Sequence, residues 1–67
     1  MTLEELLKVI PETEHLYVTC GENGENEYLG YRHHFLMGNV FLDRKVKTIQ
    51  LCWFDDNEAY LHIRLEE

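Results

Sequence analysis

The sequence predicts an α+β domain in which one short N-terminal helix packs on a three- or four-stranded antiparallel sheet, connected in the order α-β-β-β-β of a meander. Three observations lead to this fold class: apolar residues at helical spacing before Pro11, strict alternation of apolar and polar residues further along, and polar loops rich in Gly, Asn and Asp between the alternating segments. No linker, repeat or change of composition divides the chain. We therefore expect a single small α+β domain spanning residues 1–67.

The helix is expected near the N-terminus, over residues 2–10. Four apolar side chains follow the i, i+3, i+4, i+7 pattern and form one stripe: Leu3, Leu6, Leu7 and Ile10. Thr2 and Glu5 have the spacing of a capping box, and Pro11 ends the helix because the residue before a proline avoids the α region. A helix of about two turns is unstable alone, so the stripe must dock on a sheet.

The strands are expected at residues 15–20, 28–32, 45–54 and 59–65, where side chains alternate between apolar and polar. Asn23-Gly24 matches a type I′ turn with both residues at positive φ, and residues 55–58 form a second hairpin loop. Residues 33–42 fit neither period. The apolar faces of the helix and strands should combine into one core, made of Leu6, Leu7, Ile49, Leu51, Trp53, Leu61 and Ile63.

The charge of the chain is strongly acidic, with a net charge of −7, which disfavours direct binding to nucleic acid. In a meander, the loops after the first and third strands lie at the same end of the sheet. Six carboxylates should therefore form one acidic rim: Glu22, Glu25, Glu27, Asp55, Asp56 and Glu58. Arg44, Lys45 and Lys47 should lie near the opposite end. The rim would favour a partner with a basic surface, although acidity also serves solubility alone.

The second face of the sheet is the more informative feature, because a single helix covers only one face. The other face should carry Tyr17, Thr19, Thr48, Gln50, Phe54, Tyr60, His62 and Arg64. Five of these are the expected partner-binding residues: Tyr17, Phe54, Tyr60, His62 and Arg64. Aromatic, Arg and His residues with few acids are typical of protein interfaces. The alternative is an ordinary solvated face, in which Tyr and Thr are simply good strand formers.

The chain has few side chains in arrangements that are typical of catalysis or of metal binding. The chain has no serine, and Cys20 and Cys52 fall inside strands, where they are expected to be small buried or half-buried hydrophobes. The four histidines lack metal-ligand spacing, since His33 and His34 are adjacent and would point to opposite faces of a strand. No phosphate or dinucleotide fingerprint is present. We therefore expect no catalytic residues, no metal and no cofactor, and the chain is not expected to be an enzyme.

The expected compartment is the cytoplasm. Two cysteines are too few for a disulfide framework of the kind that small secreted domains need. The sequence has no charged-then-apolar leader and no apolar run of about 18 residues, so neither secretion nor a membrane span is expected.

Two segments carry a resemblance. The opening Thr2-Leu3-Glu4-Glu5-Leu6-Leu7 with Pro11, and the later Leu42-Asp43-Arg44-Lys45-Val46-Lys47-Thr48-Ile49 with the closing alternating strand, are similar to short uncharacterised proteins from phages and mobile elements of gut Firmicutes. Those proteins have a comparable helix, hairpin and L-D-x-x-V-K-x-I strand. The resemblance covers about half of the chain, residues 33–37 depart from it, and it brings no catalytic residues.

What the resemblance implies is a context, because small acidic phage proteins are often inhibitors that bind one host protein. The leading hypothesis is therefore a small acidic non-enzymatic binding protein, phage-encoded, that occludes a host protein such as one that binds nucleic acid. The alternative is a structural or assembly protein that forms a homodimer through the open sheet face.

Overall fold

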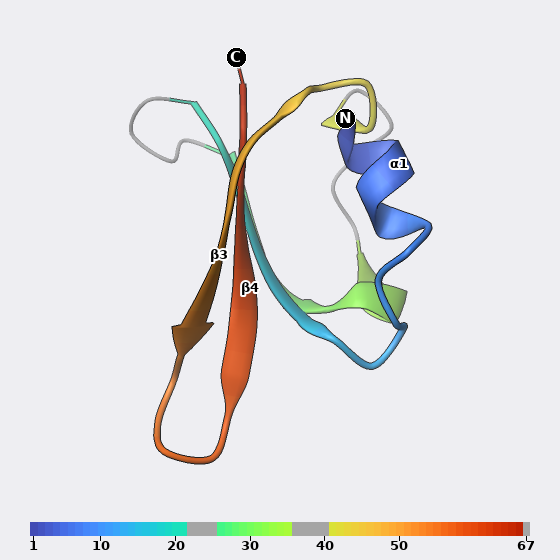
Figure 1. Cartoon of the computed structure of the whole chain (residues 1–67). Helices are drawn as coiled ribbons and strands as arrows, with labels where there is room; N and C mark the ends of the chain where they lie inside the picture. The colour runs from blue at the N-terminus through green and yellow to red at the C-terminus, as the bar shows by residue number, and fades with distance from the viewer. Residues whose placement is uncertain (22–25, 36–40, 67) are drawn as a thin grey trace.

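One short helix and four strands make up the fold in the computed structural model, which describes residues 1–21, 26–35 and 41–66. The order is α1 (Leu3–Leu7), β1 (His15–Cys20), β2 (Asn26–Tyr31), the 3-10 helix η1 (Arg32–His34), β3 (Val46–Trp53) and β4 (Ala59–Leu65). Figure 1 views the sheet nearly edge-on and shows α1 on one side of it. The α+β class, with one helix packed on a sheet, is confirmed.

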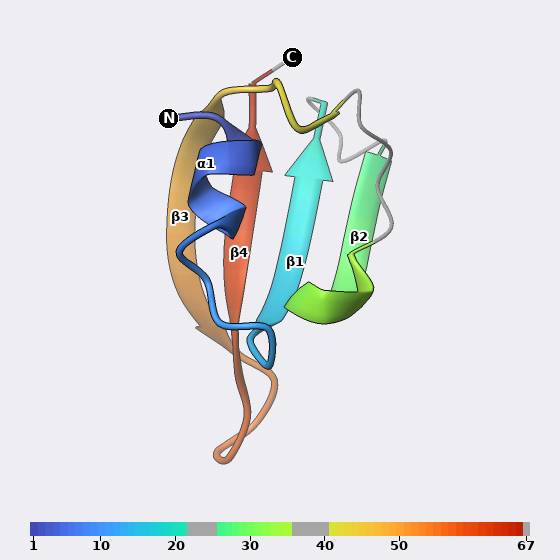
Figure 2. The ribbon, with the colours of Figure 1, turned by 90° about the vertical axis from the view of Figure 1, so that its right-hand side faces the viewer.

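The sheet is mixed, so the expected antiparallel meander is wrong. Its strand order is β2-β1-β4-β3: β1 and β2 are antiparallel, β3 and β4 are antiparallel, and β1 and β4 are parallel. Two hairpins therefore lie side by side, and β2 and β3, which follow one another in sequence, form the two opposite edges of the sheet (Figure 2). The alternation of apolar and polar residues predicts where the strands lie in the sequence, but it does not predict which strands are neighbours in the sheet. The two strands with the most deeply buried side chains, β1 and β4, occupy the centre, where both neighbours shield them.

The start of α1 is as the sequence predicts, and its end comes earlier. The Thr2 hydroxyl accepts from the Glu5 backbone N–H, and the Glu5 carboxylate accepts from the Thr2 backbone N–H at 3.0 Å, which confirms the capping box. The helix ends at Leu7 rather than Ile10. Its first turn is tied to the segment before β3, because the Leu3 N–H donates to the Arg44 carbonyl at 2.9 Å.

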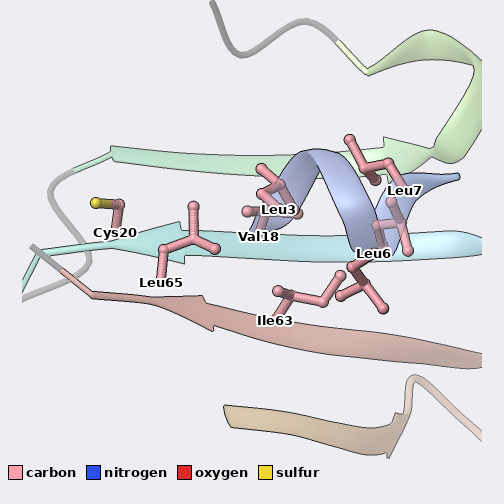
Figure 3. Close-up of a cluster of buried hydrophobic side chains, with 8 residues drawn as sticks. Leu3, Leu6, Leu7, Val18, Cys20, Ile63 and Leu65 are labelled. Carbon is pink, nitrogen blue, oxygen red and sulfur yellow. The ribbon is translucent and has the colours of Figure 1, made fainter. Parts of the chain in front are cut away.

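The core lies between α1 and the two central strands. Its buried side chains are Leu3, Leu6, Leu7, Leu16, Val18, Cys20, Ile63 and Leu65. Figure 3 labels seven of them, which come from α1, β1 and β4. Of the predicted core, Leu6, Leu7 and Ile63 are confirmed as buried, and Leu61 is partly buried against the cluster.

The other three predicted core residues, Ile49, Leu51 and Trp53, are 48%, 58% and 61% exposed, so their placement in the core is wrong. They do lie on the helix side of the sheet, since Ile49 is paired with Ile63 across the ladder. The prediction gave the correct side of the sheet for these residues but wrongly assumed that the helix covers them. β3 is an edge strand, and the side chains of α1 are buried against those of β1 and β4 in the centre of the sheet (Figure 3).

The first hairpin turn was expected at Asn23-Gly24. Asn23-Gly24 lies outside the described residues, as do Glu22 and Glu25. Gly21 follows β1 directly and has a φ of 100°, a conformation that glycine adopts without steric cost.

Candidate functional site: the open sheet face

The open face is the side of the sheet opposite α1, and no helix or strand in the described part of the chain lies over it (Figure 1). Strand register decides which side chains share it. Tyr17 is paired with His62, Thr19 with Arg64, and Cys52 with Tyr60. Phe54, directly after β3, reaches the same face and contacts Tyr60 with ring centroids 4.3 Å apart. The structure thus brings the five expected residues of this face together: Tyr17, Phe54, Tyr60, His62 and Arg64.

Aromatic rings form one unbroken series of contacts, which begins at His33 in η1 and continues across the open face. In order, the rings are His33, Tyr31, His15, Phe54, Tyr60, Tyr17 and His62. The closest stack joins His15 and Tyr31, which are cross-strand partners, with centroids 4.2 Å apart and planes within 4°. Tyr17 and His62 stack at 4.7 Å. Contacts of this kind contribute roughly 0.5–1.5 kcal/mol per aromatic pair beyond area burial, so the rings hold one another in place.

Tyr17 is fixed at its polar end by Glu27. The Tyr17 hydroxyl donates to the Glu27 carboxylate at 2.8 Å, from β1 to β2. This hydrogen bond is the main reason that the pKa of Tyr17 is raised above its usual value, and burial of the ring adds to it. Glu27 was expected on an acidic rim; it lies instead in β2 opposite Thr19, on the open face.

His62 lies at the middle of β4 between polar partners. Its Nε2 atom is 3.2 Å from the Thr19 hydroxyl, a hydrogen bond whose direction depends on the tautomer. Burial lowers the pKa of His62, and the positive charge of Arg64 lowers it further. The imidazole is therefore neutral near pH 7, as stacking on Tyr17 in a half-buried site favours.

Tyr60 joins the aromatic series to the edge strand. Burial raises the pKa of Tyr60, and a side-chain hydrogen bond with Cys52 raises it further. Both cysteines are free, with Cys20 buried on the helix side and Cys52 half-buried beside Tyr60. Their prediction as buried or half-buried small side chains is confirmed.

The single acidic rim is wrong, because β1 and β4 are parallel. Glu27 pairs near the carboxyl end of β1, whereas Asp55, Asp56 and Glu58 precede the amino end of β4, so the two groups lie at opposite ends of the sheet. Arg44, Lys45 and Lys47 lie at the start of β3, at the same end as Glu27 and opposite to the 55–58 loop. Asp55 is also engaged locally, since its carboxylate accepts from the Asn57 and Glu58 backbone N–H groups.

Sequence reasoning missed three members of the aromatic series, His15, Tyr31 and His33. His15 shares the parity of Tyr17 and could have been placed on this face from alternation alone. Tyr31 could not, because its position depends on the register of β2 against β1, which pairs it with His15. Side chains on this face remain accessible: Leu29 is 58% exposed, Tyr31 45% and Phe54 44%.

Within the residues that the structure describes, no three His, Cys, Asp or Glu side chains are grouped closely enough to hold a metal ion. In that same part of the chain, no helix has the length and apolar character that a membrane crossing requires. Comparisons of the chain with protein-family models, with curated proteins and with solved structures find no match.

Proposed function

We propose that this chain is a small non-enzymatic binding protein and that the open sheet face is the surface with which it contacts another protein. The observation that carries the proposal is the unbroken series of aromatic rings on a face that α1 leaves uncovered. Binding hot spots are enriched in Tyr, Trp and Arg side chains. Rings that already hold one another in place lose little conformational freedom when a partner binds, so more of the contact energy appears as affinity.

The composition of the face suggests the kind of partner surface. Leu29, Tyr31 and Phe54 offer exposed apolar area, and Arg64 offers an exposed guanidinium that suits a carboxylate. A mainly apolar partner patch with an acidic group would complement it. The net charge of −7 would in addition speed the approach of a partner whose wider surface is basic.

The resemblance to phage proteins implies a more specific role, in which the protein binds a host protein and inhibits it by occluding its surface. A reducing compartment such as the cytoplasm suits this role, because Cys20 and Cys52 are free thiols on opposite faces of the sheet. A homodimer formed through the same open face, as in an assembly protein, is the alternative.

Photocrosslinking in the cells that carry the gene tests which face meets a partner. A photoreactive phenylalanine analogue replaces Tyr31 on the open face or, as control, Val9, which is 74% exposed beyond α1. We expect a crosslinked protein from position 31 and none from position 9. A product of twice the 8.1 kDa mass from position 31 would favour the homodimer, and equal crosslinking from both positions would contradict the proposal.

Affinity for the crosslinked protein, once purified, then compares two neighbouring aromatic residues on opposite faces. Phe54→Ala removes a ring of the open face, whereas Trp53→Ala removes an exposed ring from the helix side. Loss of a hot spot costs about 2 kcal/mol or more, so Phe54→Ala should weaken binding roughly 30-fold, mainly through faster dissociation. Trp53→Ala should leave affinity nearly unchanged. The reverse result would assign binding to the helix side.

A further inference from the structure

β3 is an unprotected edge strand. Among the described residues, the outer edge of β3 is hydrogen-bonded only at its start, where the Val46 N–H donates to the Met1 carbonyl at 2.9 Å. On the inner edge, toward β4, the Lys45 carbonyl accepts from the Glu66 N–H. From Thr48 to Trp53, no described strand pairs with that edge. Natural edge strands are usually blunted by charges, proline or shortness. Residues 48–53 contain neither a charged residue nor a proline, and β3, with eight residues, is the longest strand described.

The helix side of this edge is apolar. Ile49, Leu51 and Trp53 alternate along it and are 48%, 58% and 61% exposed. Side chains of this size together expose on the order of 300 Å² per chain, close to the largest apolar patch that monomers usually leave uncovered. The other edge strand differs, because β2 carries a charged residue and a glycine, Glu27 and Gly30.

The charges that flank this edge are self-complementary. Three cations, Arg44, Lys45 and Lys47, lie at the beginning of β3, and three carboxylates, Asp55, Asp56 and Glu58, follow its end. Two copies of β3 running antiparallel would set the cationic end of each against the acidic end of the other. A parallel arrangement would instead oppose like charges at both ends.

From these observations, we infer that β3 pairs antiparallel with β3 of a second copy of this chain about a two-fold axis, which joins the two sheets into one. Register follows from side-chain parity, because directly opposed residues must share a face. With Leu51 on the axis, Ile49 of each chain lies opposite Trp53 of the other, and each of the three apolar residues gains an apolar cross-strand neighbour. The same register brings Lys47 opposite Asp55. Such an isologous contact closes on itself and produces a dimer rather than a fibre.

This dimer is distinct from one built through the open face. The two-fold axis is perpendicular to the joined sheet, so both open faces lie on the same side and remain free. The inference therefore does not rest on the proposed binding role of that face, and either can fail without the other.

The mass of the full-length chain as a function of concentration tests the inference. Sedimentation should show a rise from 8.1 kDa toward twice that mass over the micromolar range, as a small interface gives weak association. Trp53 is the only tryptophan, so its emission should shift to shorter wavelength with the same midpoint. A mass of 8.1 kDa at all concentrations, or an emission that does not change with the mass, would overturn the inference.

Two exposed leucines provide a matched pair of variants. Leu51 on β3 and Leu29 on β2 are each 58% exposed and lie on opposite edges of the sheet. Leu51→Lys should abolish the dimer because it places two like charges on the axis, and Leu29→Lys should leave it intact. Circular dichroism checks that both remain folded. If Leu29→Lys or Tyr31→Ala dissociates the dimer and Leu51→Lys does not, association uses the open face and the inference fails.

A charge exchange tests the antiparallel arrangement of the two β3 strands. Asp56 is used because Asp55 holds its own hairpin turn through its carboxylate. Lys47→Glu and Asp56→Lys should each weaken the dimer roughly tenfold, since each change acts twice in a symmetric pair. Combining them restores opposite charges across the axis and should return most of the affinity. Additive weakening in the double variant would overturn the antiparallel arrangement, in which the cationic end of each β3 meets the acidic loop that follows the other.

Discussion

Two isoleucines that face each other across the β3–β4 ladder should differ sharply in their contribution to stability. Ile63 is fully buried beneath α1, whereas Ile49, its direct partner, is 48% exposed. Truncating a buried isoleucine to alanine costs about 2–5 kcal/mol. Complete burial of such a side chain contributes roughly 1.5–3 kcal/mol, so a half-exposed one should lose about 1 kcal/mol. The chemistry of the two substitutions is identical, and only coverage by the helix differs.

A domain of 67 residues has a total unfolding free energy of roughly 3–10 kcal/mol, so Ile63→Ala should remove a large part of it. Urea denaturation, followed by circular dichroism and Trp53 emission, measures the difference. With a slope near 1 kcal/mol per molar urea, the midpoint should fall by on the order of 2 M or more for Ile63→Ala and by about 1 M or less for Ile49→Ala. The protein must be dilute enough to be monomeric. Equal losses would show that α1 does not bury β4 in preference to β3.

Three further substitutions probe the helix cap, the open face and the first hairpin. Thr2→Ala removes the capping box and should cost about 1 kcal/mol, lowering Tm by roughly 4–8 °C in a thermal melt; an unchanged Tm would mean that the cap does not stabilise the docked helix. The folded chain holds the pKa of His62 below the 6.5 of the unfolded chain, through burial and Arg64, so acidification protonates the unfolded state first and stability should fall as pH drops through about 6.5. His62→Gln should therefore lose less stability between about pH 7.5 and 5.5 than the wild type, and equal losses would contradict the shift. Gly30→Ala would place a Cβ 2.8 Å from the Tyr28 hydroxyl and displace that hydroxyl from the Tyr31 carbonyl to which it donates. Urea unfolding should show a loss of about 1 kcal/mol. In a Tyr28→Phe background, which lacks the hydroxyl, the additional cost of Gly30→Ala should be smaller.

The local elements of this protein could be read from the amino-acid sequence because each depends on residues close together in the chain. The capping box needs only Thr2 and Glu5, three residues apart, and β1 and β4 need only the alternation of their own side chains. The side chains that β1 and β4 contribute to the open face follow from the same alternation. Tyr17, His62 and Arg64 point away from α1 because they alternate with side chains that α1 buries.

Strand order was decided by tertiary structure, since hairpins of the same local sequence can dock in more than one arrangement. The parallel contact between β1 and β4 joins residues that are more than forty positions apart, such as Val18 and Ile63. That contact separates Glu27 from the 55–58 loop, which removes the acidic rim, and it moves β3 to the edge of the sheet. Ile49, Leu51 and Trp53 have the pattern of core residues but are exposed. Periodicity determines which way a side chain points, whereas burial depends on whether another element lies over it, and a helix of five residues covers only the centre of this sheet.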